Sequence, residues 1–176
     1  MSARPQNLAE VAARGEDLRS FGWEFQDWLH TVRSIRSRAA LQQSITSEPA
    51  SLDGKFPEGR IADAWLAAYA EHTATLADLE VPLWTRRPER TLREPWFSVT
   101  ATAERLLALR DSPPAFKNRN LFTPLVDLPL RLRAGRPPKT IEEKRRANAA
   151  RQRRFRVRRA VELDLLRHAG KMIMAE

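Results

Sequence analysis

The sequence contains no cysteine, only three histidines and only six glycines among its 176 residues. Without cysteine there can be no disulfide, no thiolate ligand for a metal ion and no thiol nucleophile. There is also no run of 18 apolar residues, so the sequence predicts no transmembrane helix. The first seven residues lack the apolar stretch that a signal peptide needs. We therefore expect a cytoplasmic protein, and its formal net charge of +9 suggests association with the nucleoid.

The residue types that most often perform catalysis are few and scattered. His30, His72 and His168 lie far apart, and no two of them have the spacing of a metal-binding helix. The glycines do not cluster into a phosphate-binding loop, and no group of Ser, His and Asp suggests an activated nucleophile. Acidic pairs such as Glu16-Asp17 and Glu142-Glu143 lie at expected helix starts, where the helix dipole accounts for them. The sequence therefore predicts a protein that is not an enzyme and needs neither a metal ion nor another cofactor.

Positive charge, in contrast, is present in excess and in one place. The formal net charge is +9, yet most of the chain is close to neutral. Residues 1–130 hold 16 basic and 17 acidic residues, and residues 160–176 hold two basic and three acidic residues. Residues 131–159 hold 13 basic and two acidic residues, so this stretch carries +11. Such a block is the electrostatic signature of a polyanionic partner. Its basic residues are Arg131, Arg133, Arg136, Lys139, Lys144, Arg145, Arg146, Arg151, Arg153, Arg154, Arg156, Arg158 and Arg159.

Aromatic residues have the opposite distribution. All five Trp lie before residue 100 and six of the seven Phe before residue 123, so the side chains for a core are in the first part of the chain. The composition changes near the proline-rich stretch 128–138. We therefore predict a helical body at residues 1–130, acting as a protein-interaction domain. Residues 131–176 are predicted to form a basic Pro/Gly linker followed by a long C-terminal helix.

The predicted fold class is mainly α: a small irregular helical domain with a possible minor β element, followed by the basic helical arm. Asn7 and Glu10 have the spacing of a capping box, and Gly15 should interrupt the helix that follows. Further helices are predicted at 17–32, 36–45, 61–79 and 102–109. The apolar stripes that should face the core are Leu18, Phe21, Phe25, Trp28, Leu29 and Val32 in the first of these and Ala64, Trp65, Ala68, Leu76 and Leu79 in the third.

The segments between these helices are predicted to be irregular. Residues 46–60 contain Pro, Gly and several Ser and should form a loop. Residues 82–97 hold three Pro and two Trp and should wrap the core. Residues 120–132 alternate in hydrophobicity and could form one or two short strands. Because proline cannot donate a backbone hydrogen bond, Pro124 and Pro129 would confine such strands to a sheet edge.

The proline-rich stretch contains Gly135-Arg136-Pro137 flanked by basic residues. Such a peptide is extended and narrow, because proline fixes φ and glycine has no side chain. It can therefore lie in a narrow A·T minor groove, where the negative potential attracts Arg136. The segment resembles an AT-hook core, although Ala134 stands where that motif usually has a basic residue. The alternative interpretation is a basic linker stiffened by proline.

A long helix should follow this stretch. Thr140 and Glu143 have the spacing of a second capping box, and residues 144–166 contain no Gly or Pro. Its basic residues lie all around the helix axis, so it has no stripe for a core and we expect it to become helical on nucleic acid. The segment from Asn148 to Arg156 resembles the basic region of bZIP proteins, and this resemblance implies that these two residues read base edges in the major groove.

A bZIP protein would also need a zipper after this region. Val161, Leu165, His168 and Met172 span fewer than two heptads, and Gly170 interrupts them. This seam is too short for a zipper that is stable by itself. The alternatives for the basic helix are an RNA-binding arm and a solvated arm.

Several short segments of the body are distinctive when taken in order. They are Asn7-Leu8-Ala9-Glu10-Val11, Arg14-Gly15-Glu16-Asp17, Glu24-Phe25, Ala62-Asp63-Ala64-Trp65-Leu66-Ala67-Ala68-Tyr69-Ala70-Glu71-His72, Val81-Pro82-Leu83-Trp84-Thr85, Arg87-Pro88-Glu89-Arg90 with Leu92, Glu94-Pro95-Trp96-Phe97, Ser112-Pro113-Pro114-Ala115-Phe116 and Arg119-Asn120-Leu121-Phe122. As a set they resemble a family of small bacterial proteins encoded beside toxins or in antitoxin-like operons. The resemblance covers residues 7–123 and implies a regulatory, antitoxin-like role with a toxin as protein partner. The tail after residue 133 lies outside it.

Together these features predict a DNA-binding regulatory protein of a toxin–antitoxin system, acting in transcription regulation. Its arm would bind DNA, which is favoured over RNA, and its body would dock a partner protein. The alternatives are an RNA- or nucleoid-associated accessory protein and a protein-interaction module whose arm binds an acidic partner. The residues expected to contact nucleic acid are the 13 basic residues of 131–159 together with Asn148.

Overall fold

The computed structural model describes residues 3–128, 130–132 and 152. The chain divides into two units, Met1–Arg133 and Ala134–Glu176. In the second unit only Gln152 is described, and it is an exposed helical residue. The first unit contains the whole predicted body.

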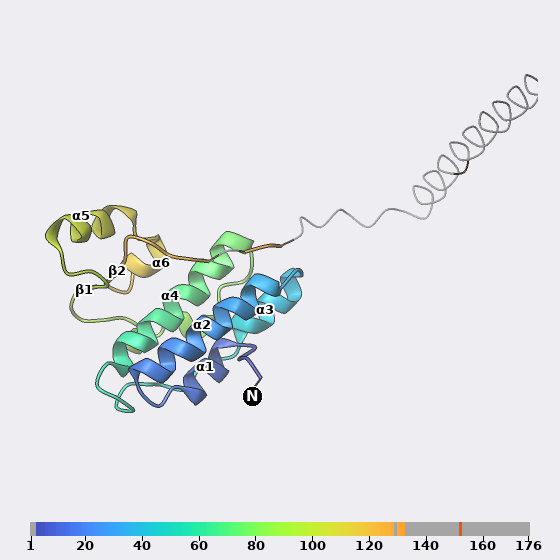
Figure 1. Cartoon of the computed structure of the whole chain (residues 1–176), viewed down its shortest axis with the longest axis horizontal. Coiled ribbons are helices and arrows are strands. Elements are labelled where there is room, and N and C mark those ends of the chain that lie inside the picture. Colours follow the sequence, from blue (N-terminus) through green and yellow to red (C-terminus); the bar gives the residue numbers. More distant parts are fainter. Residues whose placement is uncertain (1–2, 129, 133–151, 153–176) are drawn as a thin grey trace, which may run out of the picture. The chain divides into compact units, whose positions relative to one another are not determined.

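The body is mainly helical, as the sequence predicts (Figure 1). In chain order its elements are α1 (Leu8–Arg14), α2 (Leu18–Ser34), α3 (Arg38–Thr46), α4 (Gly59–Ala77), the 3-10 helices η1 (Leu83–Arg86) and η2 (Pro88–Arg90), β1 (Trp96–Phe97), α5 (Thr102–Asp111), α6 (Pro114–Lys117) and β2 (Leu121–Phe122). In the described part of the chain, no helix has the length and hydropathy that crossing a membrane requires.

Side-chain caps explain where the first helices begin. At α1 the Asn7 side chain accepts a hydrogen bond from the Glu10 backbone N–H at 2.9 Å, as the predicted capping box requires. The Glu10 carboxylate accepts from the Gln6 backbone N–H at 2.9 Å instead of from that of Asn7. At α2, Asp17 and Ser20 form a complete capping box. Gly15 ends α1, as predicted.

Helix α4 lies at the centre of the body. It contacts α2, α3, α6, η1 and η2, and it runs beside α2 (Figure 1). Small side chains line most of its circumference, which lets neighbouring elements approach closely on several sides. At the first residue of α4 the backbone itself packs against the preceding loop. A Cβ on Gly59 would lie 1.8 Å from the Leu52 carbonyl oxygen, so only glycine fits there. Its buried alanines are Ala62, Ala64, Ala67, Ala68, Ala70, Ala74 and Ala77.

The predicted apolar stripes are largely confirmed, with two exceptions. In α2 every stripe residue after Leu18 is buried, whereas Leu18 itself is 47% exposed at the first turn. In α4, Ala64 and Ala68 are buried, but Leu76 is 56% exposed. The expectation for Leu76 is wrong because the last turns of α4 bury Thr73, Ala74 and Ala77 instead.

Two short strands form the minor β element. β1 and β2 pair in parallel, with Trp96 opposite Leu121 and Phe97 opposite Phe122. The Trp96 N–H donates to the Asn120 carbonyl at 2.8 Å, and the Phe97 and Phe122 rings stack at 5.0 Å. The pairing therefore holds together the two ends of the segment between the strands. This segment contains α5 and α6 and lies to one side of α4 (Figure 1).

The predicted strand region 120–132 is a strand only at β2. Beyond it, partly buried apolar side chains pack against the core, so the alternation in the sequence reflects packing rather than a sheet. An ion pair between Arg33 and Asp127 joins this segment to α2. Core packing thus continues two residues past residue 130. The packed residues are Val126, Leu128, Leu130 and Leu132.

Candidate functional site

Most residues predicted to bind nucleic acid lie outside the described part of the chain. Arg131 is described: its side chain is exposed, and its carbonyl oxygen accepts a hydrogen bond from Arg36 Nη1 at 3.4 Å. This contact leaves the Arg131 guanidinium at the surface. The predicted residues outside the described part are Arg133, Arg136, Lys139, Lys144, Arg145, Arg146, Asn148, Arg151, Arg153, Arg154, Arg156, Arg158 and Arg159.

The basic residues of the body are largely engaged within the body itself. Nine of the 16 in residues 1–130 form ion pairs with carboxylates. With a net charge of −1, residues 1–130 carry no excess to attract a polyanion. The nine are Arg4, Arg14, Arg33, Arg38, Arg60, Arg87, Arg90, Arg110 and Arg119.

The most buried of these pairs joins η2 to α4. Arg90 is 4% exposed and Asp63 1% exposed, and Arg90 donates both to Asp63 and to the Pro49 carbonyl. The other Asp63 oxygen accepts from the backbone N–H groups of Leu52 and Asp53 at 3.0 and 3.1 Å. Because buried charges are tolerated only when paired and hydrogen-bonded, this cluster fixes the loop before α4.

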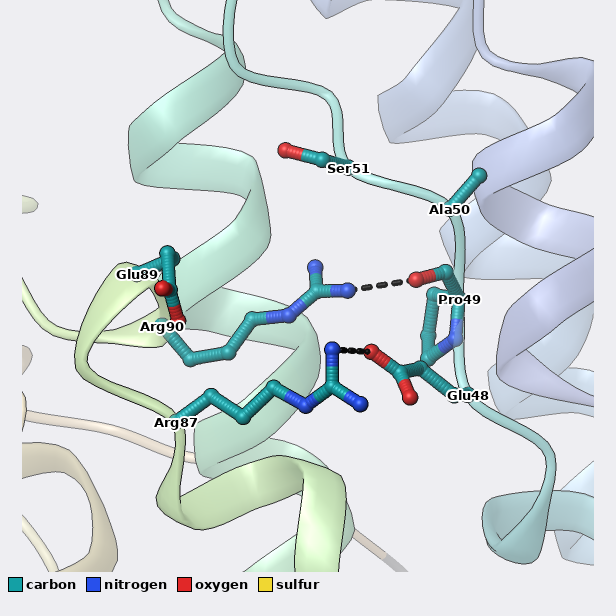
Figure 2. A pocket seen from close by; sticks show the side chains of 7 residues that line it. All are labelled: Glu48, Pro49, Ala50, Ser51, Arg87, Glu89 and Arg90. Carbon is teal, nitrogen blue, oxygen red and sulfur yellow. Dashed lines mark hydrogen bonds and ion pairs between the residues drawn. The ribbon is translucent and has the colours of Figure 1, made fainter.

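A cleft of about 510 Å³ adjoins this cluster (Figure 2). Arg87 and Arg90 extend side by side across it toward the segment that holds Glu48 and Pro49. Arg87 Nη1 pairs with Glu48 Oε1 at 2.8 Å. Each guanidinium therefore already faces an acceptor of this chain, and we assign the cluster a structural role.

A second buried arginine ties α6 to α4 and η1. Arg119 is 4% exposed, and its Nη2 donates to Glu71 Oε2 at 2.6 Å and to the Thr85 carbonyl at 2.7 Å. Its Nη1 donates to the Ala115 carbonyl at 2.6 Å. Arg119 also lines a polar cleft of about 360 Å³, whose other lining residues include three threonines and Asn118.

A third cleft, which we call the aromatic cleft, differs from these two in being mainly apolar. Its volume is about 450 Å³. Burial, and secondarily the nearby Asp127 carboxylate, raises the pKa of Tyr69 to about 12, so its phenol stays protonated near neutral pH. Such a cleft is suited to binding an apolar group rather than to acid–base chemistry. It is lined by Leu18, Phe21, Gly22, Phe25 and Gln26 of α2, by Glu58 and by Ile61, Ala62, Trp65 and Tyr69 of α4, and by Trp96 of β1.

The histidines do not assemble a catalytic or metal-binding group in the described part of the chain. His30 is exposed, and His168 lies outside the described residues. His72 packs edge-on against Phe116 at 5.9 Å, and burial lowers the pKa of its imidazole. Across residues 3–128 and 130–132, no cluster of three or more His, Asp or Glu residues could hold a metal ion.

Comparison with known proteins gives no family for this chain: no family model, no curated protein and no solved structure matches it. The resemblance to antitoxin-like proteins therefore stays a prediction.

Sequence reasoning did not identify the buried arginine clusters or the aromatic cleft. Arg90 and Arg119 both lie within segments that resemble the antitoxin-like family, but nothing in their spacing shows burial. Gly22 did offer a signal for the cleft. It stands inside a predicted helix, where glycine costs about 1 kcal/mol relative to alanine.

Proposed function

We propose that the protein is a DNA-binding regulator of antitoxin type, with DNA bound by residues 131–159 and a protein partner docked by the body. The observation that carries the proposal is the separation of charge. Residues 131–159 carry +11, whereas residues 1–130 carry −1 and pair nine of their basic residues internally. Affinity for a polyanion should therefore depend on the basic stretch rather than on the body.

The surface of α5 supports the proposal that the body docks a protein partner. Of its ten residues only Ala108 is buried, while Leu106 is 63% exposed and Leu107 and Leu109 are also exposed. Several large apolar side chains exposed on one short helix are a feature of protein-contact surfaces. This helix is the face on which we expect a partner protein to dock.

The decisive experiment compares the full chain with a chain that ends at Arg133. The truncated chain keeps Leu130 and Leu132, whose packing the body needs. Both are titrated with duplex DNA from the region upstream of the gene, with random duplex of equal length, and with RNA. We expect truncation to remove nearly all duplex binding while leaving the helical circular dichroism of the body unchanged. Equal binding by the two chains would refute the proposal.

The three nucleic acids also separate the proposal from its alternatives. Preference of the full chain for its own upstream region supports a regulator. Equal binding to both duplexes and to RNA would indicate a nucleoid- or RNA-associated accessory protein. If no nucleic acid binds but an acidic protein does, the chain is an interaction module.

A matched pair of variants tests the location of the charge within the full chain. Arg153→Ala and Arg93→Ala each remove one positive charge, the first from the basic stretch and the second from an exposed position of the body. Only Arg153→Ala should weaken duplex binding, and it should reduce the slope of log K against log salt by about 0.9. Equal losses for both variants would show that the body shares the DNA contact.

A further inference from the structure

We propose that the aromatic cleft is a binding site for a neutral, planar aromatic small molecule. Its volume of about 450 Å³ lies within the roughly 300–1,000 Å³ of pockets that hold such ligands. It has walls from three elements, α2, α4 and β1, so it is concave, unlike the exposed helix α5. A concave site of this size suits a small molecule that lies between the three elements.

The walls of the cleft have the geometry that aromatic ligands prefer. Trp65 and Trp96 meet edge to face, with centroids 6.0 Å apart and an interplanar angle of 83°. Trp65 also stacks on Tyr69 at 5.7 Å, and Phe21 stacks on Phe25 at 5.9 Å. Because aromatic rings attract one another in stacked and edge-to-face arrangements, a planar ligand can extend this set of contacts.

The charge of the lining restricts the ligand further. Among the described residues that line the cleft there is no Lys, Arg or His, and Glu58 is the one charged residue. The Tyr69 phenol is neutral near pH 7. An anionic ligand would be repelled by Glu58 and would find no positive partner, so the lining disfavours an anion and is compatible with a neutral ligand.

Gly22 supplies an independent indication of an occupant. It lies inside α2, where glycine destabilises a helix by about 1 kcal/mol relative to alanine. A Cβ at this position would meet nothing within 4 Å, so no neighbour in the described structure requires glycine there. Gly22 does line the cleft, where the absent side chain lets a ligand lie close to the helix backbone.

The test uses two dyes with one ring system. N-phenyl-1-naphthylamine is neutral, and 1-anilinonaphthalene-8-sulfonate is the same molecule with an added sulfonate. We expect the full chain to bind the neutral dye saturably at one site, with increased dye fluorescence, and to bind the sulfonate more weakly. Failure of the neutral dye to saturate at one site, or its displacement by an equal concentration of the sulfonate, would overturn the proposal.

Two substitutions at Gly22 locate the site. Gly22→Leu should occupy the part of the cleft beside the α2 backbone and weaken dye binding by about tenfold or more, or about 1.4 kcal/mol, because the dye would lose that space. Gly22→Ala should weaken binding less while raising the melting temperature by about 2–4 °C, because alanine favours the helix. Its melting curve also shows that the variant is folded. A Gly22→Ala chain that melts higher and binds the dye unchanged would contradict a ligand role for this glycine.

Leu106→Ala on α5 is the matched control, because it removes an exposed apolar side chain outside the cleft. It should leave dye binding unchanged. If Leu106→Ala abolishes binding and Gly22→Leu does not, the dye occupies a protein-docking surface and the small-molecule proposal is wrong. The proposed DNA binding is measured separately on the basic stretch, so either proposal can fail without the other.

Discussion

The stability of the body depends strongly on the buried charge of Asp63. Its carboxylate accepts hydrogen bonds from Arg90, from Ser51 and from two backbone N–H groups of the loop before α4. Asp63→Ala should therefore lower the free energy of unfolding by about 3–5 kcal/mol, because the Arg90 guanidinium would remain buried without its counter-charge. Denaturant titration of the variant measures this loss.

The exposed pair of Arg87 and Glu48 provides the control for Asp63. Glu48→Ala should cost about 1 kcal/mol or less, since solvent screens this pair. The double substitution Asp63→Ala with Arg90→Met should recover part of the loss, because it removes both charges. A double variant less stable than Asp63→Ala would show that the unpaired charge is not the cause.

His72 should make the stability of the body depend on pH. Burial holds its pKa below the ordinary value of 6.5, so the unfolded chain binds a proton more readily than the folded one. Stability present above pH 6.5 should fall as the pH drops toward the folded pKa and then level off. His72→Gln should flatten the melting temperature between about pH 7 and pH 5. The exposed His30, changed to Gln, should leave that slope intact.

Asn148 decides how much sequence information the basic stretch carries. If the stretch binds only by charge, Asn148→Ala removes no charge and introduces a better helix former, so duplex affinity should stay constant or rise slightly. If it reads bases as a bZIP region does, one sequence should lose about 1–3 kcal/mol of binding free energy. We expect the first result. Binding to a panel of duplexes would reveal the second as a loss on a single sequence.

Arg136 should affect a different set of duplexes. From the sequence we expect Gly135-Arg136-Pro137 to be the part of the stretch that can enter a narrow minor groove. Arg136→Ala is therefore expected to weaken binding mainly on A·T-rich duplex, whereas Arg154→Ala should weaken binding to every duplex about equally. Equal losses on all duplexes for Arg136→Ala would favour a simple basic linker.

The N-terminal caps of α3 and α5 predict opposite effects of substitution on stability. Ser37 caps α3, accepting from the Ala40 N–H at 3.1 Å, whereas Ala101 at the start of α5 offers no side-chain cap. Ser37→Ala should cost about 1 kcal/mol of unfolding free energy, and Ala101→Ser should add a similar or smaller amount. The two are compared by denaturant titration. If Ala101→Ser fails to stabilise while Ser37→Ala destabilises, the start of α5 does not have cap geometry in solution.

Helix positions were predictable from the sequence because local rules determine them. Asn7, Gly15 and the apolar spacing of α2 act through neighbours within four residues, and the structure confirms all three, except that Leu18 is exposed. The pairing of β1 with β2 was not predictable, because it joins residues 25 apart through two-residue strands with no periodic pattern.

The candidate sites depend on long-range packing, and the sequence was correspondingly less informative about them. The aromatic cleft brings together α2, α4 and β1, and the ion pair of Arg90 with Asp63 joins residues 27 apart. Neither follows from residue spacing. The basic stretch was visible at once because charge density along the chain needs no fold to be recognised.

For the whole molecule, the division of charge predicts how binding responds to salt. If the basic stretch makes about six to ten phosphate contacts, duplex affinity should fall on the order of a thousandfold or more between 50 and 200 mM salt. Melting of the body should change little over the same range, because exposed ion pairs contribute little to stability. Titrations at several salt concentrations test both. A flat binding response would point to an apolar or protein contact in place of DNA.

The position of the last core residues in the sequence also determines the order in which the two parts of the chain are synthesised. Leu132 packs against the core, and the charged residues 134–159 follow directly in the sequence. At about 5–20 residues per second, a ribosome needs roughly 1–5 s to add these 26 residues, and small domains commonly fold within that time. Every residue that packs in the core is therefore synthesised before the segment that attracts nucleic acid.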